Sequence, residues 1–163
     1  MSLTVRIEES GSQNCSIFLS GSLDEDAWNE LNQLNSIQHS SVVISLRDLD
    51  YINSLGVRNW ISFLKLFGEG RKVVFRECPS YFIKQLNMIP RLIGDAEVES
   101  FYGDFYCAGC DEEKNLIFET SEGYKGLSEK FAKLACDVCN ETLEFEEDFG
   151  SYFEFLKRKT KLP

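Results

Sequence analysis

Four cysteines in two Cys-x-x-Cys pairs constrain the fold of this chain more than any other feature. The pairs are Cys107 with Cys110 and Cys136 with Cys139, and a stretch of about 25 residues separates them, as in many zinc sites. Four thiolates that converge on one tetrahedral Zn²⁺ would satisfy this pattern and leave no open position for a water molecule. We therefore expect a structural rather than a catalytic Zn²⁺ site.

Two other chemistries use cysteines in this arrangement. A redox-active Cys-x-x-Cys usually occurs once in a chain, at the end of a strand that leads into a helix, so two pairs favour a metal. An iron–sulfur centre stays open as an alternative, because thiolates also hold iron. Alternating apolar residues beside both pairs predict that each half is strand, cysteine turn and strand, an arrangement that resembles a zinc ribbon.

Aromatic residues near the C-terminus have the spacing of an amphipathic helix. The apolar positions are Phe149, Tyr152, Phe153 and Leu156. We expect this helix to cover the ribbon or to seal it to the upstream part of the chain. The alternative is an exposed docking face for a partner or for a second copy of the protein, which leaves homo-oligomerisation open.

The upstream hundred residues have the pattern of an α/β layer. Residues 3–7 and 15–19 predict a hairpin of two strands, and the β-branched run at residues 42–44 predicts a strand in the centre of a sheet. Helical spacing over residues 57–67 and a further strand at residues 72–76 continue the alternation. Strands and helices that alternate in this way imply an α/β sheet with right-handed crossovers.

Several element boundaries follow from local signals. Ser22 begins a capping-box pattern, so we expect its hydroxyl to cap a helix that contains Leu31 and Leu34. Pro79 suits the first position of another helix. Residues 96–101 alternate like a last, short strand. We therefore expect one unit over residues 1–101 and a second unit, the zinc ribbon with its terminal helix, over residues 102–163.

Three segments of the upstream unit resemble the STAS domain of anti-sigma-factor antagonists. They read FLSGSLD at residues 18–24, VVISL at residues 42–46 and YINSLG at residues 51–56. The resemblance implies a mixed sheet with helices packed on it. It also implies that the turn at residues 53–56 forms part of a partner-binding surface, where the family carries a phosphorylated hydroxyl just before a glycine.

The chain departs from the family at this turn. Asn53 stands where the family has aspartate, and Leu55, which has no hydroxyl, stands at the phosphorylated position. We expect Ser54 to be the N-cap of the next helix, and direct participation of Ser54 in binding or modification is the alternative. Gly56 is expected to let the first turn of that helix approach the sheet closely.

Composition narrows the function classes. The net charge of −10 argues against broad contact with nucleic-acid phosphates. No apolar run approaches the roughly 20 residues that a membrane span needs, and residues 1–9 alternate apolar and charged side chains, unlike a signal peptide. In an intracellular chain, six cysteines favour metal binding over disulfides. We expect a cytoplasmic protein without nucleic-acid or membrane partners. The single histidine, His39, lies in a polar stretch, so no Ser-His-acid triad can be built and no enzyme is expected.

The resemblance implies a non-enzymatic protein-interaction module of bacterial signalling. Its partner would be an anti-sigma factor or a kinase-like signalling protein, bound through Asn53, Ser54, Leu55 and Gly56. Because Leu55 cannot be phosphorylated, binding is expected to lack the usual phosphoswitch. The alternative is a small-ligand or nucleotide sensor that uses the helix N-terminus at Ser54. Nucleic-acid binding through the ribbon is disfavoured by its acidity.

Overall fold

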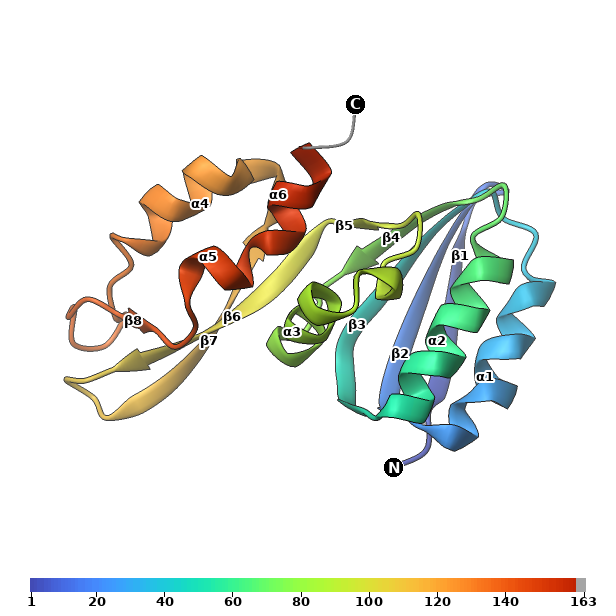
Figure 1. The fold of residues 1–163 in the computed structure, drawn as a ribbon, viewed down its shortest axis with the longest axis horizontal. Helices are drawn as coiled ribbons and strands as arrows, with labels where there is room; N and C mark the ends of the chain where they lie inside the picture. The colour runs from blue at the N-terminus through green and yellow to red at the C-terminus, as the bar shows by residue number, and fades with distance from the viewer. Residues whose placement is uncertain (161–163) are drawn as a thin grey trace.

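The computed structural model of the chain describes residues 1–160, which form two sheets that lie side by side (Figure 1). The last three residues of the expected second unit, 161–163, lie outside the described residues. A mixed α/β fold with helices packed on the sheet is confirmed. The first sheet contains, in spatial order, β1 (Thr4–Ser10), β2 (Asn14–Leu23), β3 (Ser41–Ile52), β4 (Lys72–Arg76) and β5 (Glu97–Val98).

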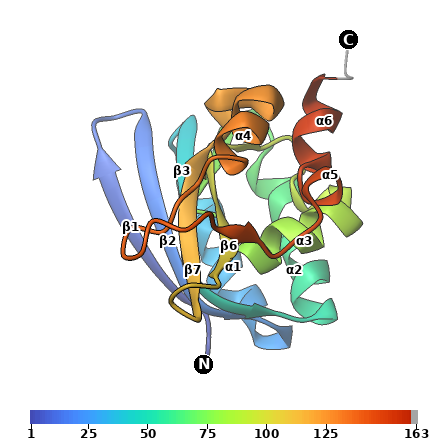
Figure 2. The ribbon, with the colours of Figure 1, turned by 90° about the vertical axis from the view of Figure 1, so that its left-hand side faces the viewer.

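The strand order explains why one face of the first sheet carries the helices. β1 and β2 form an antiparallel hairpin, whereas β2, β3, β4 and β5 are parallel neighbours in chain order. Right-handed crossovers that advance in one direction place every connecting helix on the same face, and Figure 2 shows this arrangement. The helices are α1 (Trp28–Gln33), α2 (Ser54–Phe67) and α3 (Ser80–Met88).

The core of the first lobe lies between these helices and the sheet. Ile17, Ile44 and Phe75, on three neighbouring strands, are fully buried, and so is Trp60 of α2. The indole nitrogen of Trp60 donates a hydrogen bond to the carbonyl of Leu92 (2.8 Å), so this large side chain is buried without an unsatisfied donor. Short 3₁₀ turns occur at Glu25–Ala27, Leu34–Ser36, Pro90–Leu92 and Thr120–Glu122.

The second lobe is built on a hairpin. Its sheet consists of β7 (Glu112–Glu119), β6 (Ser100–Cys107) and β8 (Glu144–Phe145), with β6 in the middle and both pairings antiparallel. Phe105, Phe118, Phe131 and Phe153 pack against one another, with ring centroids 4.5–5.8 Å apart in contacting pairs. The helices are α4 (Gly123–Phe131), α5 (Phe149–Tyr152) and α6 (Glu154–Thr160).

The C-terminal helices seal the second lobe to the first, as the main expectation for the aromatic segment stated. The side chain of Asn87 in α3 donates to the carbonyl of Tyr152 (2.8 Å) and accepts from the backbone N–H of Phe155 (2.9 Å). Tyr152 and Phe153 are buried. The expectation of one helix is wrong, because α5 ends at Tyr152 and α6 starts at Glu154. None of the helices within residues 1–160 is long and apolar enough to cross a membrane.

Several expected boundaries are wrong for identifiable reasons. Ser22 is buried near the end of β2, and the carboxylate of Asp24 caps the following 3₁₀ turn instead. Pro79 precedes the first helical residue of α3, because its ψ of 152° is extended. Residues 96–101 do not form one strand. The N–H of Glu99 donates to Phe75 in the first sheet, whereas its carbonyl accepts from Thr120 beside the second.

The second half of the ribbon also differs from the expectation of strand, cysteine turn and strand. A helix, α4, precedes the second cysteine pair, and only the short β8 follows it. The sequence signal for α4 is weak because Gly123 and Gly126, residues of low helix propensity, both lie within it. Tyr124, Leu127 and Phe131 nevertheless have helical spacing, and Leu127 and Phe131 are buried.

Candidate metal centre and protein-binding face

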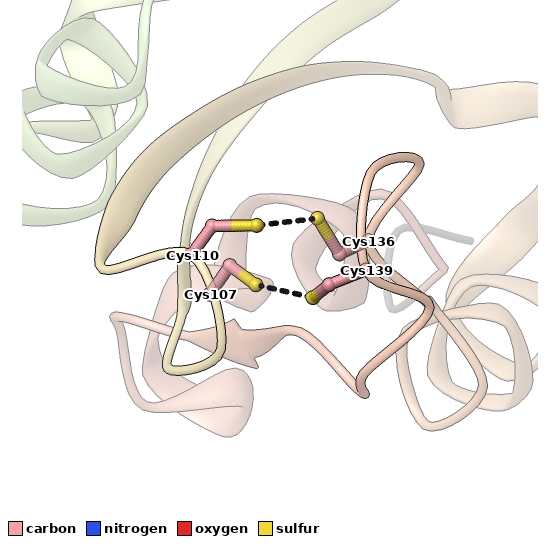
Figure 3. Close-up of side chains that lie close together, drawn as sticks. All are labelled: Cys107, Cys110, Cys136 and Cys139. Carbon is pink, nitrogen blue, oxygen red and sulfur yellow. Dashed lines mark hydrogen bonds between the residues drawn. The ribbon is translucent and has the colours of Figure 1, made fainter.

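The four cysteines of the two pairs come together at one end of the second lobe (Figure 3). Their sulfur atoms all lie within 4.8 Å of one another, with 3.3 Å between Cys107 and Cys139 and 3.7 Å between Cys110 and Cys136. A tetrahedral site with metal–sulfur bonds of about 2.3 Å separates its sulfurs by about 3.8 Å. The donor set and its spacing therefore fit one metal ion.

The backbone around each pair forms the tight turn that such a site needs. The residue after the second cysteine of each pair, Asp111 or Asn140, has a positive φ (54° and 62°). The two turns also approach each other closely, because a Cβ atom on Gly109 would lie 2.8 Å from the carboxylate of Glu141 and 2.9 Å from the Cys139 sulfur. Gly109 thus permits the approach of the two turns.

Secondary structure fixes both turns in place. Cys107 is the last residue of β6 and pairs with Glu112, the first residue of β7, so the first turn closes a hairpin. The second turn is held by hydrogen bonds from the N–H of Cys136 to the carbonyl of Glu141 (2.7 Å) and from the N–H of Leu143 to that of Leu134 (2.9 Å). Both pairs are positioned by backbone hydrogen bonds that involve no metal.

Two thiols of this cluster differ in how readily they ionise. Backbone N–H groups of Cys139 and Val138 lower the pKa of Cys136 to about 7. In contrast, the thiols of Cys139, Cys136 and Cys107, together with desolvation, raise the pKa of Cys110 to about 12. A divalent cation at the centre would favour all four thiolates, because metal binding displaces the thiol protons.

The geometry disfavours the redox reading of the same cysteines. Cys110 is followed directly by the turn into β7, and Cys139 by a loop that leads to β8, so neither pair opens a helix. A helix N-terminus would help to stabilise a reactive thiolate. The other two cysteines, Cys15 and Cys78, are buried in the first lobe, where desolvation strongly raises the pKa of Cys78.

The second group of expected site residues lies at the start of α2. Asn53, not Ser54, is the N-cap. Its backbone is extended (φ −105°, ψ 177°), and its side-chain oxygen accepts a hydrogen bond from the N–H of Gly56 (2.8 Å). Ser54 is the first residue of α2 and is exposed. The expectation that Ser54 caps the helix is therefore wrong.

Gly56 lies at a backbone–backbone contact between α2 and the end of β2. A Cβ atom at this position would lie 1.7 Å from the carbonyl oxygen of Leu23. The contact is reinforced by Asn53, whose N–H donates to the same carbonyl (3.1 Å), and by Asn59, whose side chain donates to the carbonyl of Asp24 (3.0 Å). The expected close approach of the first turn to the sheet is present.

The apolar side chain of Leu55 points outward at the start of α2. It is 48% exposed, and Tyr51, at the end of β3, is 54% exposed. Leu55 and Trp28 of α1 line a shallow hollow of about 340 Å³ whose polar rim includes Glu25 and Arg58. The hollow combines exposed apolar surface with a charged rim, which is the composition of a small protein-docking site.

Glu25 places a carboxylate beside the N-terminus of α2. The side-chain amide of Asn53 donates to its Oε2 (2.9 Å). This hydrogen bond, together with one from the Glu25 backbone, lowers the pKa of Glu25, so the side chain is ionised at neutral pH. A helix N-terminus attracts anions, but here a carboxylate of the protein already lies beside it.

The capping assignment predicts unequal effects at two adjacent residues. Asn53→Ala should lower the free energy of unfolding by about 1 kcal/mol, because it removes the acceptor for the Gly56 N–H. Ser54→Ala, one residue away, should leave it nearly unchanged. Urea unfolding followed by circular dichroism measures both variants. A larger loss at Ser54 than at Asn53 would contradict the observed cap.

Glu25 and Trp28 belong to this surface, but the sequence alone did not single them out. Both precede the turn at residues 53–56 by more than twenty positions, so only the fold brings them together. Trp28 lies at the start of α1, in an apolar stripe of the sequence with Leu31 and Leu34, which predicts a place in the core. It is half-buried instead, at the edge of the hollow.

Comparisons with known proteins concern part of this fold. No family model matches the sequence, and no curated protein matches it. Among solved structures, the chain is similar to the anti-sigma factor antagonist SpoIIAA in its unphosphorylated form, with 15% identity over 45% of this chain and 72% of that one and a TM-score of 0.36. It is also similar to an uncharacterized DUF3478-family protein with a SpoIIAA-like fold from Shewanella loihica PV-4, with 13% identity over 61% and 85% of the chains and a TM-score of 0.43. These similarities concern the fold alone.

Proposed function

We propose that this chain is a non-enzymatic protein-interaction module of bacterial signalling. The start of α2, with Asn53, Ser54, Leu55 and Gly56, forms its protein-binding face together with Trp28. The partner is an anti-sigma factor or a related kinase-like protein, as the STAS resemblance of this region implies. The four cysteines bind a structural Zn²⁺ that holds the second lobe in its folded form.

The exposed Leu55 beside the hollow is the observation that carries this proposal. The side chain is 48% exposed at a position where the backbone is rigidly held by Asn53 and Gly56. An apolar group on a fixed backbone loses little conformational entropy when it inserts into a partner. The same side chain cannot accept a phosphate, so binding at this face is constitutive.

The alternative of a nucleotide or phosphate sensor is less well supported by the same geometry. The Gly56 N–H is already bonded to Asn53, and the ionised carboxylate of Glu25 lies beside the helix start. A phosphate would meet like charge there. The nearby guanidinium of Arg58 is exposed and lies on the rim of the hollow, where it suits an ion pair with a protein partner.

Zn²⁺ is the metal that we propose for the cysteine cluster. Four sulfur ligands in a tetrahedral arrangement suit zinc, and four protein ligands leave no position for a reacting water. An iron–sulfur centre is the alternative that the same donors allow. Metal analysis and the visible absorption spectrum of the purified protein distinguish the two.

A pair of leucine substitutions on α2 tests the protein-binding face. Leu55→Arg should abolish capture of the partner from a lysate of the native host, because a charge would be buried in the contact. Leu66→Arg is the matched control, since Leu66 is also exposed (57%) but lies near the other end of the helix. Mass spectrometry identifies the protein that wild type and Leu66→Arg retain and Leu55→Arg loses.

Two results would contradict the proposal. Equal capture by Leu55→Arg and Leu66→Arg would place the binding surface elsewhere. Capture that required stoichiometric phosphate on Ser54 would exclude constitutive binding. Stabilisation of the protein by nucleotides, measured as a rise in its melting temperature, would instead support the sensor alternative.

A further inference from the structure

The outer edge of β1 is an open strand edge at one side of the first sheet (Figure 1). Among the strands of residues 1–160, β1 pairs only with β2, so the backbone groups along its other side face away from the sheet. Its pairing with β2 runs without a shift from Thr4 to Ser10, and the strand contains no proline. Prolines and bulges are common means of blocking an edge, because an open edge pairs readily with another strand. β1 is therefore able to accept a further strand.

An apolar row that crosses the first sheet is left uncovered at this edge. One residue from each of four neighbouring strands forms the row, in the order Ile7, Ile17, Ile44 and Phe75. The last three are fully buried on the face that carries the helices, whereas Ile7 is 46% exposed. The row thus ends in an exposed apolar side chain on the open strand.

The opposite face of β1 carries one cation and one anion. Side chains alternate between the two faces of a strand, so Arg6 and Glu8 lie on the face without helices. They form an exposed ion pair within β1, and the Arg6 guanidinium lies 4.1 Å from the centre of the Phe18 ring. The two charges flank Ile7, which is the middle residue of the seven-residue strand. The strand therefore has opposite charges placed symmetrically about its centre.

These positions select one register for pairing with a second copy of the chain. In an antiparallel pair of identical strands, the backbone hydrogen bonds match only when the two-fold axis passes midway between a residue and its own counterpart. An axis at Ile7 pairs all seven residues of β1 and places each Arg6 opposite a Glu8. An axis one residue earlier or later would place Arg6 opposite Arg6 or Glu8 opposite Glu8, and facing like charges destabilise a sheet. Full overlap and charge therefore favour the same register.

We infer that a second copy of this chain occupies the edge, joined through β1 in this register. Each Arg6 then faces Glu8 of the other copy, and the two Ile7 side chains meet beside the axis, where they extend the apolar row across the junction. The backbone hydrogen bonds hold the two strands together, and the charge pairs fix their register. The axis leaves the helices of both copies on the same face of one continuous sheet. This inference goes beyond the proposed function and does not rest on it.

Sedimentation equilibrium of the full-length chain tests the inference. A contact between two edge strands buries little surface and small interfaces are weak, so protein concentrations from about 10 µM to about 1 mM are needed. A monomer–dimer equilibrium is expected. Ile7→Lys should raise its dissociation constant at least about tenfold, because two ammonium groups would meet at the axis. Ile117→Lys is the matched control, since Ile117 is similarly exposed (47%) but lies on β7, an edge strand of the other sheet, and it should leave association unchanged.

A pair of charge reversals tests the register itself. Arg6→Glu gives β1 two anions at these positions, and Glu8→Arg gives it two cations, so each variant alone should associate at least about tenfold more weakly than wild type. An equimolar mixture of the two variants should associate again, because each cation of one strand then faces an anion of the other. Neither variant retains the ion pair within β1, so recovery in the mixture reports a contact between chains. Circular dichroism checks that both variants are folded.

Three results would overturn the inference. The first is a monomeric wild-type chain at every concentration. The second is a dimer that Ile7→Lys weakens no more than Ile117→Lys does, which would place the contact elsewhere. The third is a mixture of the two charge variants that associates no more strongly than either variant alone. Because Arg6 and Glu8 are exposed, the mixture stays informative even if Ile7→Lys disturbs the fold.

Discussion

Removal of one candidate metal ligand, by Cys139→Ser, is expected to abolish binding of the proposed zinc and to unfold the second lobe while the first sheet stays folded. Cys139 is the exposed member of the cluster, so serine removes a ligand with little loss of packing. Structural zinc contributes on the order of 10–16 kcal/mol in small modules, comparable with the whole stability of a domain. Hydrogen exchange should show lost amide protection from β6 to β8 and retained protection in β1–β4.

A neighbouring substitution separates the ligand effect from local disturbance. Val138→Ser changes a side chain that is 72% exposed in the same turn, and it should retain the metal and the protection pattern. The metal content of each protein is measured alongside its hydrogen exchange. A wild-type chain that keeps full protection of the second lobe after a strong chelator has removed its metal would contradict a structural role for the ion.

Gly56→Ala should strongly lower the free energy of unfolding of the first lobe, because the structure leaves no room for the added methyl group. The added carbon would lie 1.7 Å from the carbonyl oxygen of Leu23, and both sides of this contact are backbone. Neither the helix nor the strand end can yield by a rotamer change. We expect a loss of roughly 3 kcal/mol, at the upper end of overpacking effects, and a melting temperature about 6–12 °C lower.

The same change at Gly126 serves as the control. Gly126 lies inside α4, and its nearest neighbour to an added Cβ is the Glu122 Cβ at 3.6 Å, an ordinary contact. Gly126→Ala should therefore stabilise the chain by about 1 kcal/mol through helix propensity. Thermal unfolding of both variants by calorimetry checks the pair. Similar melting temperatures for Gly56→Ala and wild type would exclude a close approach of α2 to β2.

Periodicity predicted most elements of the first lobe, because most of its strands and helices bury one face. β1 is the exception, since none of its residues is buried and Ile7 is 46% exposed. Boundaries were predicted less well where two suitable residues lie close together. Ser22 and Asp24 can both cap a helix, and the choice depends on how far β2 continues to pair with β3, up to Leu23 with Ile52. Asn53 and Ser54 pose the same choice, which the extended backbone of Asn53 decides.

The two candidate sites differ in how far the sequence reveals them. The candidate metal ligands follow from spacing alone, since each Cys-x-x-Cys pair brings two sulfurs together within one turn. The surface around Leu55 depends on tertiary contacts instead. Nothing local links Glu25 to Asn53, and the hydrogen bond between them exists only because α2 starts beside the end of β2.

The passage from β5 to β6 has a mechanical consequence. A single residue, Glu99, separates the two sheets. Its N–H donates to Phe75 in the first sheet, and its carbonyl accepts from Thr120, directly after β7 of the second. A connection of one doubly tethered residue cannot act as a hinge. Any macromolecule that spans both lobes would therefore meet a preformed, stiff platform, and its association would carry almost no penalty for aligning the two halves.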